Sequence, residues 1–317
     1  MLLAGMLLLP ATSGLARADD SGVSAVVLQA EHLNGDGKYR DAIALLDGYL
    51  RDHPQDARAL VDRGDDYQAL DQQNAAIADY SAALAVNPLY AYAYASRCES
   101  RFDVDQSGAV ADCNKAIELE PRLAYAYRVR AAIELDGGDA QTAVADATKA
   151  LQITPQSPHA LSTRCHAYLL LGQYAAALTD CNAAIALDPN YDYPYFYRGR
   201  VELHQQSWNA AIADLKAALR IDSGDTNAYY WLAAAELGAG SYADALADAD
   251  RFVQSNVDDA DGHLLRAQIE AKLGNAAQAR ASATTALRHY RIDNDDAGAA
   301  KAQTLLNSLG DAGQTTP

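Results

Sequence analysis

Prolines recur along this chain at a nearly constant interval. They are separated by 34, 33, 34 and 34 residues, at Pro54, Pro88, Pro121, Pro155 and Pro189. The intervals also share other residues at corresponding positions. Residues 76–80 (AIADY) and residues 177–181 (ALTDC), for example, stand at the same distance before a proline. A fixed period of this length indicates a solenoid, in which each unit buries apolar surface only against its neighbours.

The repeat can be laid out as consecutive units by setting the proline at the thirty-second place. Eight units follow, at residues 23–56, 57–90, 91–123, 124–157, 158–191, 192–225, 226–259 and 260–292. Each contains two helical patterns split by a turn; in the fifth unit these cover about 159–171 and 174–187. The third unit is one residue short, and we place the deletion near Asp105. The sequence therefore predicts an all-α solenoid of about eight helix-turn-helix repeats.

The two ends of the chain differ from the repeats. Apolar residues with helical spacing predict a capping helix over 293–309, followed by a disordered tail over 310–317. Residues 1–10 are apolar and precede Ala16-Arg17-Ala18, which predicts a signal peptide over 1–18 and a short linker over 19–22, although no Lys or Arg precedes the apolar run. No cysteine lies near the cleavage point. We therefore expect an exported protein, periplasmic or secreted, that is not a lipoprotein.

Small residues mark two places inside every unit. The eighth place holds Ala30, Gly64, Cys98, Ala131, Cys165, Gly199, Ala233 and Ala267, and the twentieth place is always alanine. Small side chains let two helices pack closely. This pair, the terminal proline and an aromatic residue that begins several second helices (Tyr39, Tyr174, Trp208, Tyr242) resemble the tetratricopeptide repeat family over about residues 23–290. The resemblance implies a right-handed superhelix whose concave face, built from first helices, often holds a partner segment.

The four cysteines repeat one arrangement. Cys98 and Cys113 occupy the eighth and twenty-fourth places of the third unit, and Cys165 and Cys181 occupy the same places of the fifth. Both places are equidistant from the turn, so antiparallel helices should bring them within the ~5.5–6 Å Cα separation of a disulfide. We predict the disulfides Cys98–Cys113 and Cys165–Cys181; buried thiols are the alternative. A zinc site or a redox motif is disfavoured, because the pairs are two units apart and no Cys-x-x-Cys occurs.

Opposite charges recur at two further places. Arginine stands at the seventh place of six units and aspartate at the twenty-third place of six, giving Arg63, Arg97, Arg130, Arg164, Arg198, Arg266, Asp79, Asp112, Asp146, Asp180, Asp214 and Asp248. We call this set the arginine–aspartate ladder and expect structural ion pairs, because every arginine has a candidate carboxylate. Pairing within a unit leaves Asp248 and Arg266 over. Pairing across neighbouring units leaves Arg63 and Asp214 over, and the sequence leaves both patterns open.

The resemblance also implies a set of groove residues on the first helices. Their places hold aromatic and charged residues that suit an extended peptide, namely Tyr92, Glu99, Tyr125, Arg128, His159, His166, Tyr193, Phe196, Arg200 and Tyr230. We predict that the partner lies along units three to six; the alternative is that the tyrosines only pack within the solenoid. The family's clamp for C-terminal carboxylates needs Lys and Asn, where this chain has Val61, Ala95 and Asp65. His159, His166 and His204 lack an orienting carboxylate, so no metal site is expected.

Charge and motifs restrict the function further. Acidic residues number 42 against 25 Lys and Arg, a net charge of -17, which argues against nucleic-acid partners and anionic membrane surfaces. No apolar stretch is long enough to insert in a membrane. No catalytic motif, phosphate loop or cofactor site is recognisable. We therefore expect a non-catalytic scaffold of the cell envelope or secreted space that binds a protein or peptide; a structural spacer or oligomerisation module is the alternative, and an enzyme is less favoured.

Overall fold

The computed structural model describes residues 23–310, which form helices and connections without a strand. The predicted signal peptide, the linker and residues 311–317 lie outside the described part. The described chain divides into two compact units, the first ending at Leu171 and the second beginning at Gly172. This division falls at the turn of the fifth predicted repeat.

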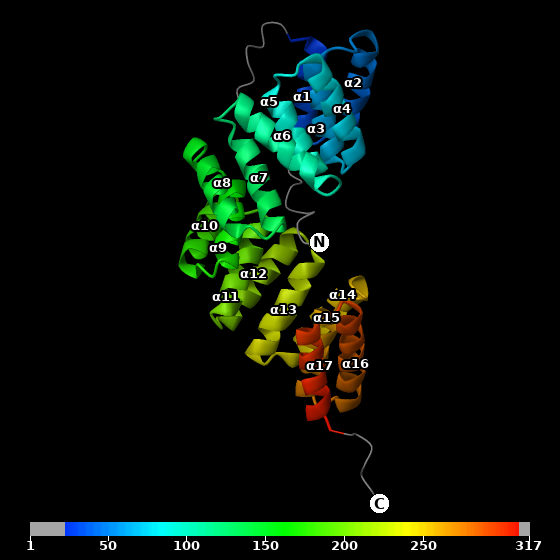
Figure 1. The fold of residues 1–317 in the computed structure, drawn as a ribbon, viewed down its shortest axis with the longest axis vertical. Coiled ribbons are helices and arrows are strands. Elements are labelled where there is room, and N and C mark those ends of the chain that lie inside the picture. The colour runs from blue at the N-terminus through cyan, green and yellow to red at the C-terminus, as the bar shows by residue number, and fades with distance from the viewer. Residues whose placement is uncertain (1–22, 311–317) are drawn as a thin grey trace, which may run out of the picture. The chain divides into compact units, whose positions relative to one another are not determined.

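The helices follow one another with short connections (Figure 1). The first unit contains α1 (Ala25–Gly35), α2 (Tyr39–Asp52), α3 (Ala57–Ala69), α4 (Gln73–Val86), α5 (Ala91–Arg101), α6 (Gln106–Leu119), α7 (Ala124–Asp136), α8 (Ala140–Ile153) and α9 (Pro158–Leu170). The second contains α10 (Tyr174–Leu187), α11 (Asp192–His204), α12 (Trp208–Ile221), α13 (Thr226–Ala239), α14 (Tyr242–Ser255), α15 (Ala260–Lys272), α16 (Ala276–Ile292) and α17 (Asp296–Ser308).

Each unit is built from helix pairs that pack on the next pair. In the first unit α3 packs on α4, α5 on α6 and α7 on α8, and each of these odd-numbered helices also contacts the odd-numbered helix of the next pair. In the second unit α11, α13, α15 and α17 are joined in the same way. Among the described residues no such contact joins one even-numbered helix to the next, so each stack curves with its odd-numbered helices inside. We call the face that these helices form the inner face.

Local chemistry explains where the helices begin and turn. Asp56 caps α3 by accepting hydrogen bonds from the backbone N–H groups of Arg58 and Ala59. Within several pairs the turn uses a left-handed residue, as at Gly138 (φ 82°) and Gln206 (φ 59°). The described α5–α6 connection has no left-handed residue, in keeping with the one-residue deletion in this repeat.

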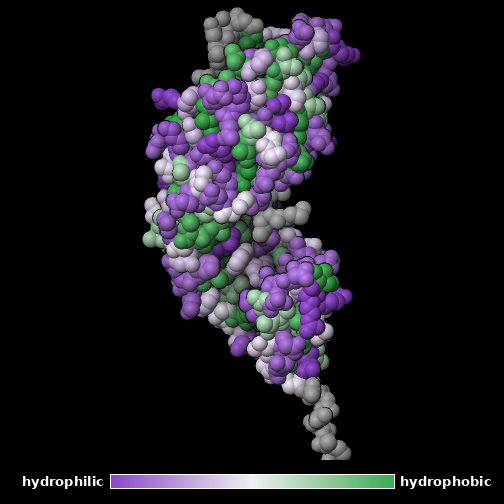
Figure 2. All heavy atoms as spheres, viewed as in Figure 1, coloured by the Kyte–Doolittle hydropathy of each residue, from purple (hydrophilic) through white to green (hydrophobic). Residues whose placement is uncertain are grey.

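Small residues at the eighth and twentieth places lie in the interior. The alanines at both places are fully or almost fully buried, for example Ala131 and Ala143. At Gly64 the space for a side chain is filled by Tyr80, because a Cβ there would lie 2.6 Å from Tyr80 Cε1. Hydrophilic residues cover most of the visible surface of each unit, with hydrophobic residues showing between them (Figure 2). No helix among residues 23–310 combines the length and hydropathy required to cross a bilayer.

Cysteine pairs complete the fold. Cys98 on α5 and Cys113 on α6 form a disulfide with a Cα–Cα distance of 5.4 Å. Cys165 and Cys181 are disulfide-bonded as well, and none of the described cysteines is a free thiol. The first of these bonds joins the two helices of the repeat that has the shortened turn, so it closes a pair whose connection lacks a left-handed residue.

Candidate functional site

Glu99 is the centre of a polar network on the inner face of the first unit. The residue is only 6% exposed, and its carboxylate accepts hydrogen bonds from Gln68 Nε2 (2.5 Å), Arg128 Nη2 (3.0 Å) and the hydroxyl of Tyr125. The guanidinium carbon of Arg128 also lies 5.1 Å from the centre of the Tyr125 ring. These contacts connect α3, α5 and α7, so three successive repeats hold one carboxylate in place.

A second carboxylate, Asp65, organises the neighbouring tyrosines. Asp65 Oδ1 accepts from the hydroxyl of Tyr80 (2.8 Å) and Oδ2 from the hydroxyl of Tyr92 (3.2 Å). The rings of Tyr92 and Tyr125 lie 5.7 Å apart, which joins the two networks. Burial raises the pKa values of Tyr80 and Tyr125 well above the ordinary range, so both hydroxyls act as donors at neutral pH. The tyrosines of this face are therefore fixed by hydrogen bonds as well as by packing.

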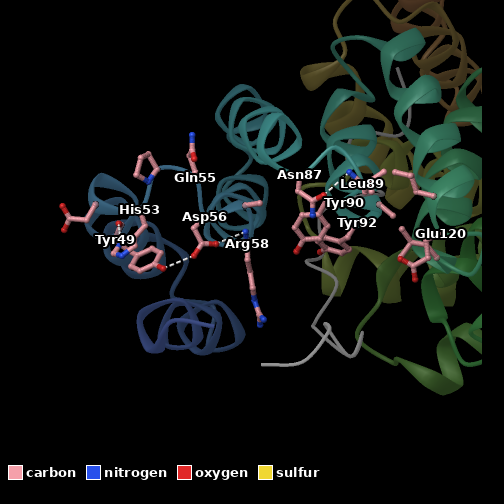
Figure 3. A pocket seen from close by; sticks show the side chains of 16 residues that line it. Tyr49, His53, Gln55, Asp56, Arg58, Asn87, Leu89, Tyr90, Tyr92 and Glu120 are labelled. Atoms are coloured by element: carbon pink, nitrogen blue, oxygen red, sulfur yellow. Dashed lines mark hydrogen bonds between the residues drawn. The ribbon is translucent and has the colours of Figure 1, made fainter. Parts of the chain in front are cut away.

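A pocket of about 1250 Å³ opens beside this network (Figure 3). Its walls come from three connections between repeats, over residues 52–58, 87–92 and 119–123, together with Tyr49 on α2. Tyr92 lines the pocket and also binds Asp65, so the pocket and the network adjoin. The most exposed apolar wall residue is Leu89, at 73%. Sequence reasoning missed this pocket, although the proline period marks each of its three connections.

The charges that line the pocket are mostly negative. Asp52, Asp56 and Glu120 contribute carboxylates, whereas the guanidinium of Arg58 is occupied by two hydrogen bonds to Glu31, at 2.9 and 2.7 Å. Asp56 is fixed at the cap of α3 and also accepts from the hydroxyl of Tyr49, at 2.9 Å (Figure 3). The pocket is therefore an acidic recess with tyrosine and leucine walls.

The groove residues predicted from the sequence fall in both units. Tyr92, Glu99, Tyr125, Arg128, His159 and His166 belong to the first unit, and Tyr193, Phe196, Arg200 and Tyr230 belong to the second. Three of them are more buried than an exposed groove requires, namely Glu99, His166 and Phe196. Phe196 is only 5% exposed, and its ring centre lies 5.3 Å from that of Tyr197. It therefore cannot serve as an exposed anchor for a partner.

The arginine–aspartate ladder has a clear geometry in the structure. Arg63, Arg97, Arg130 and Arg198 each donate through Nε and Nη2 to the two oxygens of the aspartate in the same repeat, over 2.5–2.9 Å. Through Nη1, ladder arginines donate to the twenty-fifth place of the preceding repeat, at Asp47, Ser81, Asn114, Thr148 and Asn182. Each such arginine thus binds two repeats together. The sequence signal that we missed is that polar residues recur at the twenty-fifth place.

The seventh repeat departs from the ladder because Leu232 stands where the arginine would be. Lys216, at the twenty-fifth place of the sixth repeat, instead places Nζ 2.8 Å from Glu236, whose side chain is only 1% exposed. Asp248 lies near Arg251, at 3.7 Å, and Arg266 pairs with Asp250 at 2.8 Å. One lysine therefore supplies the positive charge that the missing arginine would provide.

Carboxyls next to the ladder have raised pKa values. Burial, reinforced by the neighbouring Asp146, raises the pKa of Glu134 to about 7. Burial and the neighbouring Asp214 do the same for Glu202. Each carboxyl shares one arginine with a second carboxyl, so one positive charge serves two acids. Among residues 23–310 no group of three metal-binding side chains is arranged to hold an ion.

The repeat geometry is matched by comparisons with known families. Residues 27–65 match the tetratricopeptide repeat family, and residues 68–206 match the family described as the ETO1 C-terminal domain. The chain is a tetratricopeptide repeat protein. No curated protein sequence matches it significantly.

Solved structures share the fold of this tetratricopeptide repeat protein at low identity. In the APC/C hetero-tetramer Cut9–Hcn1, a chain that is 15% identical matches 90% of this protein with a TM-score of 0.75, although the protein spans only 55% of that chain. PilF of Pseudomonas aeruginosa (18% identity, TM-score 0.57) matches 68% of this protein and 96% of its own length. PilW, a type IV pilus biogenesis factor (24% identity, TM-score 0.57), matches 68% of this protein and 98% of its own length.

Proposed function

We propose that this protein is a non-catalytic interaction scaffold that binds a segment of a partner protein at the first unit, in the pocket beside Tyr92. The observation that carries this proposal is the pocket of about 1250 Å³ next to a network that three repeats hold in place. Ligand sites are typically concave, with apolar walls and a few placed polar groups, and volumes of roughly 300–1,000 Å³ suit a small molecule. The larger pocket here suits several side chains of a peptide.

The chemistry of the walls defines the partner segment. Carboxylates of Asp52, Asp56 and Glu120 favour a basic residue, and the exposed Leu89 favours an apolar one beside it. Because Tyr92 is already fixed by Asp65, the site loses little conformational entropy on binding. The preferred ligand is therefore a basic and apolar segment.

Export is proposed on separate grounds. All described cysteines are oxidised, and disulfides persist in oxidising compartments. Together with the predicted signal peptide, this supports a periplasmic or secreted protein. The pilus role stated for PilW belongs to that protein, and its likeness to this chain supports the fold alone.

Photo-crosslinking tests the binding site. A benzoylphenylalanine at position 89 in the full chain, exposed to an envelope fraction, should crosslink to one partner and identify its bound segment by mass spectrometry. The matched control places the same probe at Val257, which is 61% exposed and lies in the seventh repeat one place before the position that corresponds to Leu89. The same partner crosslinked equally at both positions would contradict the proposal.

Affinity measurements with the identified segment complete the test. The double variant Leu89→Ser/Glu120→Lys should weaken binding by roughly tenfold or more, because both changes remove contacts that the pocket offers. The matched control is Val257→Ser/Asp258→Lys, which makes the same changes at an exposed connection of the second unit. Unchanged affinity in the pocket variant, with unchanged circular dichroism, would favour the alternative of a structural spacer.

A further inference from the structure

Arg200 on the inner face of the second unit differs from the other inner arginines. Its guanidinium carbon lies 5.5 Å from the centre of the Phe196 ring on the same helix and 4.6 Å from the Trp231 ring on α13. Its Nε is completely covered and has no acceptor among the described residues. The residue as a whole stays partly exposed.

Several other partly buried arginines of the chain are paired with carboxylates. Arg128 pairs with Glu99, Arg198 with Asp214 and Arg58 with Glu31. Arg200 has no acidic side chain within ion-pair distance among the residues that the structure describes, although the protein carries 42 acidic residues. Burial lowers its pKa, as expected for a cation that lacks a counter-charge. Stacking on aromatic rings offsets only part of the cost of burying a charge.

We infer that Arg200, held by Phe196 and Trp231, is a receptor for a carboxylate group of a bound ligand. A guanidinium that packs its face on rings keeps its N–H edge for a ligand, and this edge matches a planar carboxylate in a two-point contact. The ligand would complete the ion pair that the chain itself leaves open at this position. The aromatic rings keep the guanidinium oriented before the ligand arrives.

The surroundings favour a singly charged ligand over a phosphate. Burial raises the pKa of Tyr197; Asp225 and Asp192 act in the same direction and Arg200 opposes them, so all three charged groups lie near this ring. Two carboxyls near the site repel a dianion more than a carboxylate. The carboxylate can come from an acidic side chain or from a chain terminus, since the two present the same atoms.

The site is independent of the proposed pocket in the first unit, because all its residues lie between Phe196 and Trp231 in the second. Failure of one proposal therefore leaves the other standing. The Arg200 site also differs from the family's clamp for C-terminal carboxylates. That clamp needs Lys and Asn, which the first complete repeats of this chain lack.

Selection from defined peptide libraries tests the receptor. Immobilised full-length protein is offered two acetylated and amidated hexapeptide libraries that differ only in a fixed central residue, Glu or Gln. A third library carries Gln and a free C-terminal carboxylate. We expect retention of the Glu library to exceed that of the Gln library by roughly tenfold, the size expected when a charge-assisted hydrogen bond is lost. Retention of the third library shows whether a terminal carboxylate also binds.

Variants assign the effect to Arg200. Arg200→Gln should abolish the preference for Glu, and Arg200→Lys, which keeps the charge without the planar fork, should retain a reduced preference. Arg220→Gln, on the exposed surface of α12, is the matched control and should leave the preference unchanged. Equal retention of both libraries by the wild type, or an undiminished preference in a folded Arg200→Gln protein, would overturn the inference.

Fluorescence gives a second readout that reports on the site directly. The protein has two tryptophans, so Trp208→Phe leaves Trp231 as the only reporter. Titration with a peptide retained from the Glu library should shift the emission of Trp231 until the shift saturates. The same peptide with Gln in place of Glu should cause no shift at the same concentrations. Inorganic phosphate is titrated in parallel. Stronger competition by phosphate than by the carboxylate peptide would overturn the assignment of ligand class.

Discussion

At the residue scale, the eighth place of each repeat sets how the two helices meet. Where it holds glycine, a large side chain from the second helix uses the space, as Tyr80 does over Gly64 and Leu215 does over Gly199. Tyr80 is completely buried, and its hydroxyl is fixed by Asp65 and Gln68. The glycine and the tyrosine are therefore a matched pair. The alanine that occupies this place in other repeats cannot replace Gly64 without displacing the ring of Tyr80.

A pair of glycine substitutions tests this account. Gly64→Ala should lower the free energy of unfolding by roughly 1–3 kcal/mol, because its Cβ overpacks a ring that cannot move. Gly48→Ala is the matched control in the middle of α2, where the nearest atom to a new Cβ is 3.8 Å away. It should stabilise by up to about 1 kcal/mol through helix propensity. Urea denaturation measures both, and a neutral or stabilising Gly64→Ala would contradict the packing argument.

At the element scale, the pair α5 and α6 is closed by different means from its neighbours. Its connection lacks the left-handed residue used elsewhere, and the Cys98–Cys113 disulfide links the two helices instead. Arg97 and Arg101 both bind Asp112 across the same interface. The pair thus keeps its packing through a covalent link and two ion pairs.

Removing this link should weaken the pair without unfolding it. The disulfide spans 15 residues of sequence, and a loop of that size contributes about 3 kcal/mol in the chain-entropy account. We expect Cys98→Ala/Cys113→Ala to unfold at lower urea concentration while far-ultraviolet circular dichroism at zero urea stays the same. The ion pair between Arg97 and Asp112 is left intact in this variant, so only the covalent link between the two helices is removed. An unchanged midpoint would show that packing alone holds the pair.

At the scale of the whole molecule, buried carboxyls make stability depend on pH. Burial raises the pKa of Asp66 and of Glu134 to about 7 in the first unit, and that of Glu202 to about 7 in the second. Between the ordinary carboxyl pKa and about 7, the folded protein holds protons that the unfolded chain has released. Folding then takes up protons, so stability falls as pH rises through this window.

The melting temperature should therefore be higher near pH 5 than near pH 8. Glu134→Gln imitates the protonated carboxyl, so it should raise the melting temperature at pH 8 and change it little at pH 5. Glu118→Gln is the matched control, because Glu118 is exposed and pairs only with Lys115 among its described neighbours. Calorimetry at the two pH values measures the effect. A melting temperature that rises from pH 5 to pH 8 would refute the sign of this dependence.

The sequence by itself determined the repeat and its class of fold. The prolines and the small residues at the eighth and twentieth places repeat every 33–34 residues, and the paired cysteines recur two repeats apart at the same places. Such features depend only on contacts between neighbouring helices. These contacts form within one repeat or between adjacent repeats, so the residue spacing in the sequence is enough to predict them. The positions of Cys98 and Cys113 across a turn are an example.

The tertiary structure decided what the inner surface can do. The choice between the two ladder pairings, the substitution of Lys216 for a missing arginine and the burial of Phe196 depend on side-chain directions that spacing leaves open. The acidic pocket is formed by three connections that lie over 30 residues apart in the chain, and their common wall exists only after the repeats stack. The unmatched charge of Arg200 likewise became visible only once its neighbours were in place.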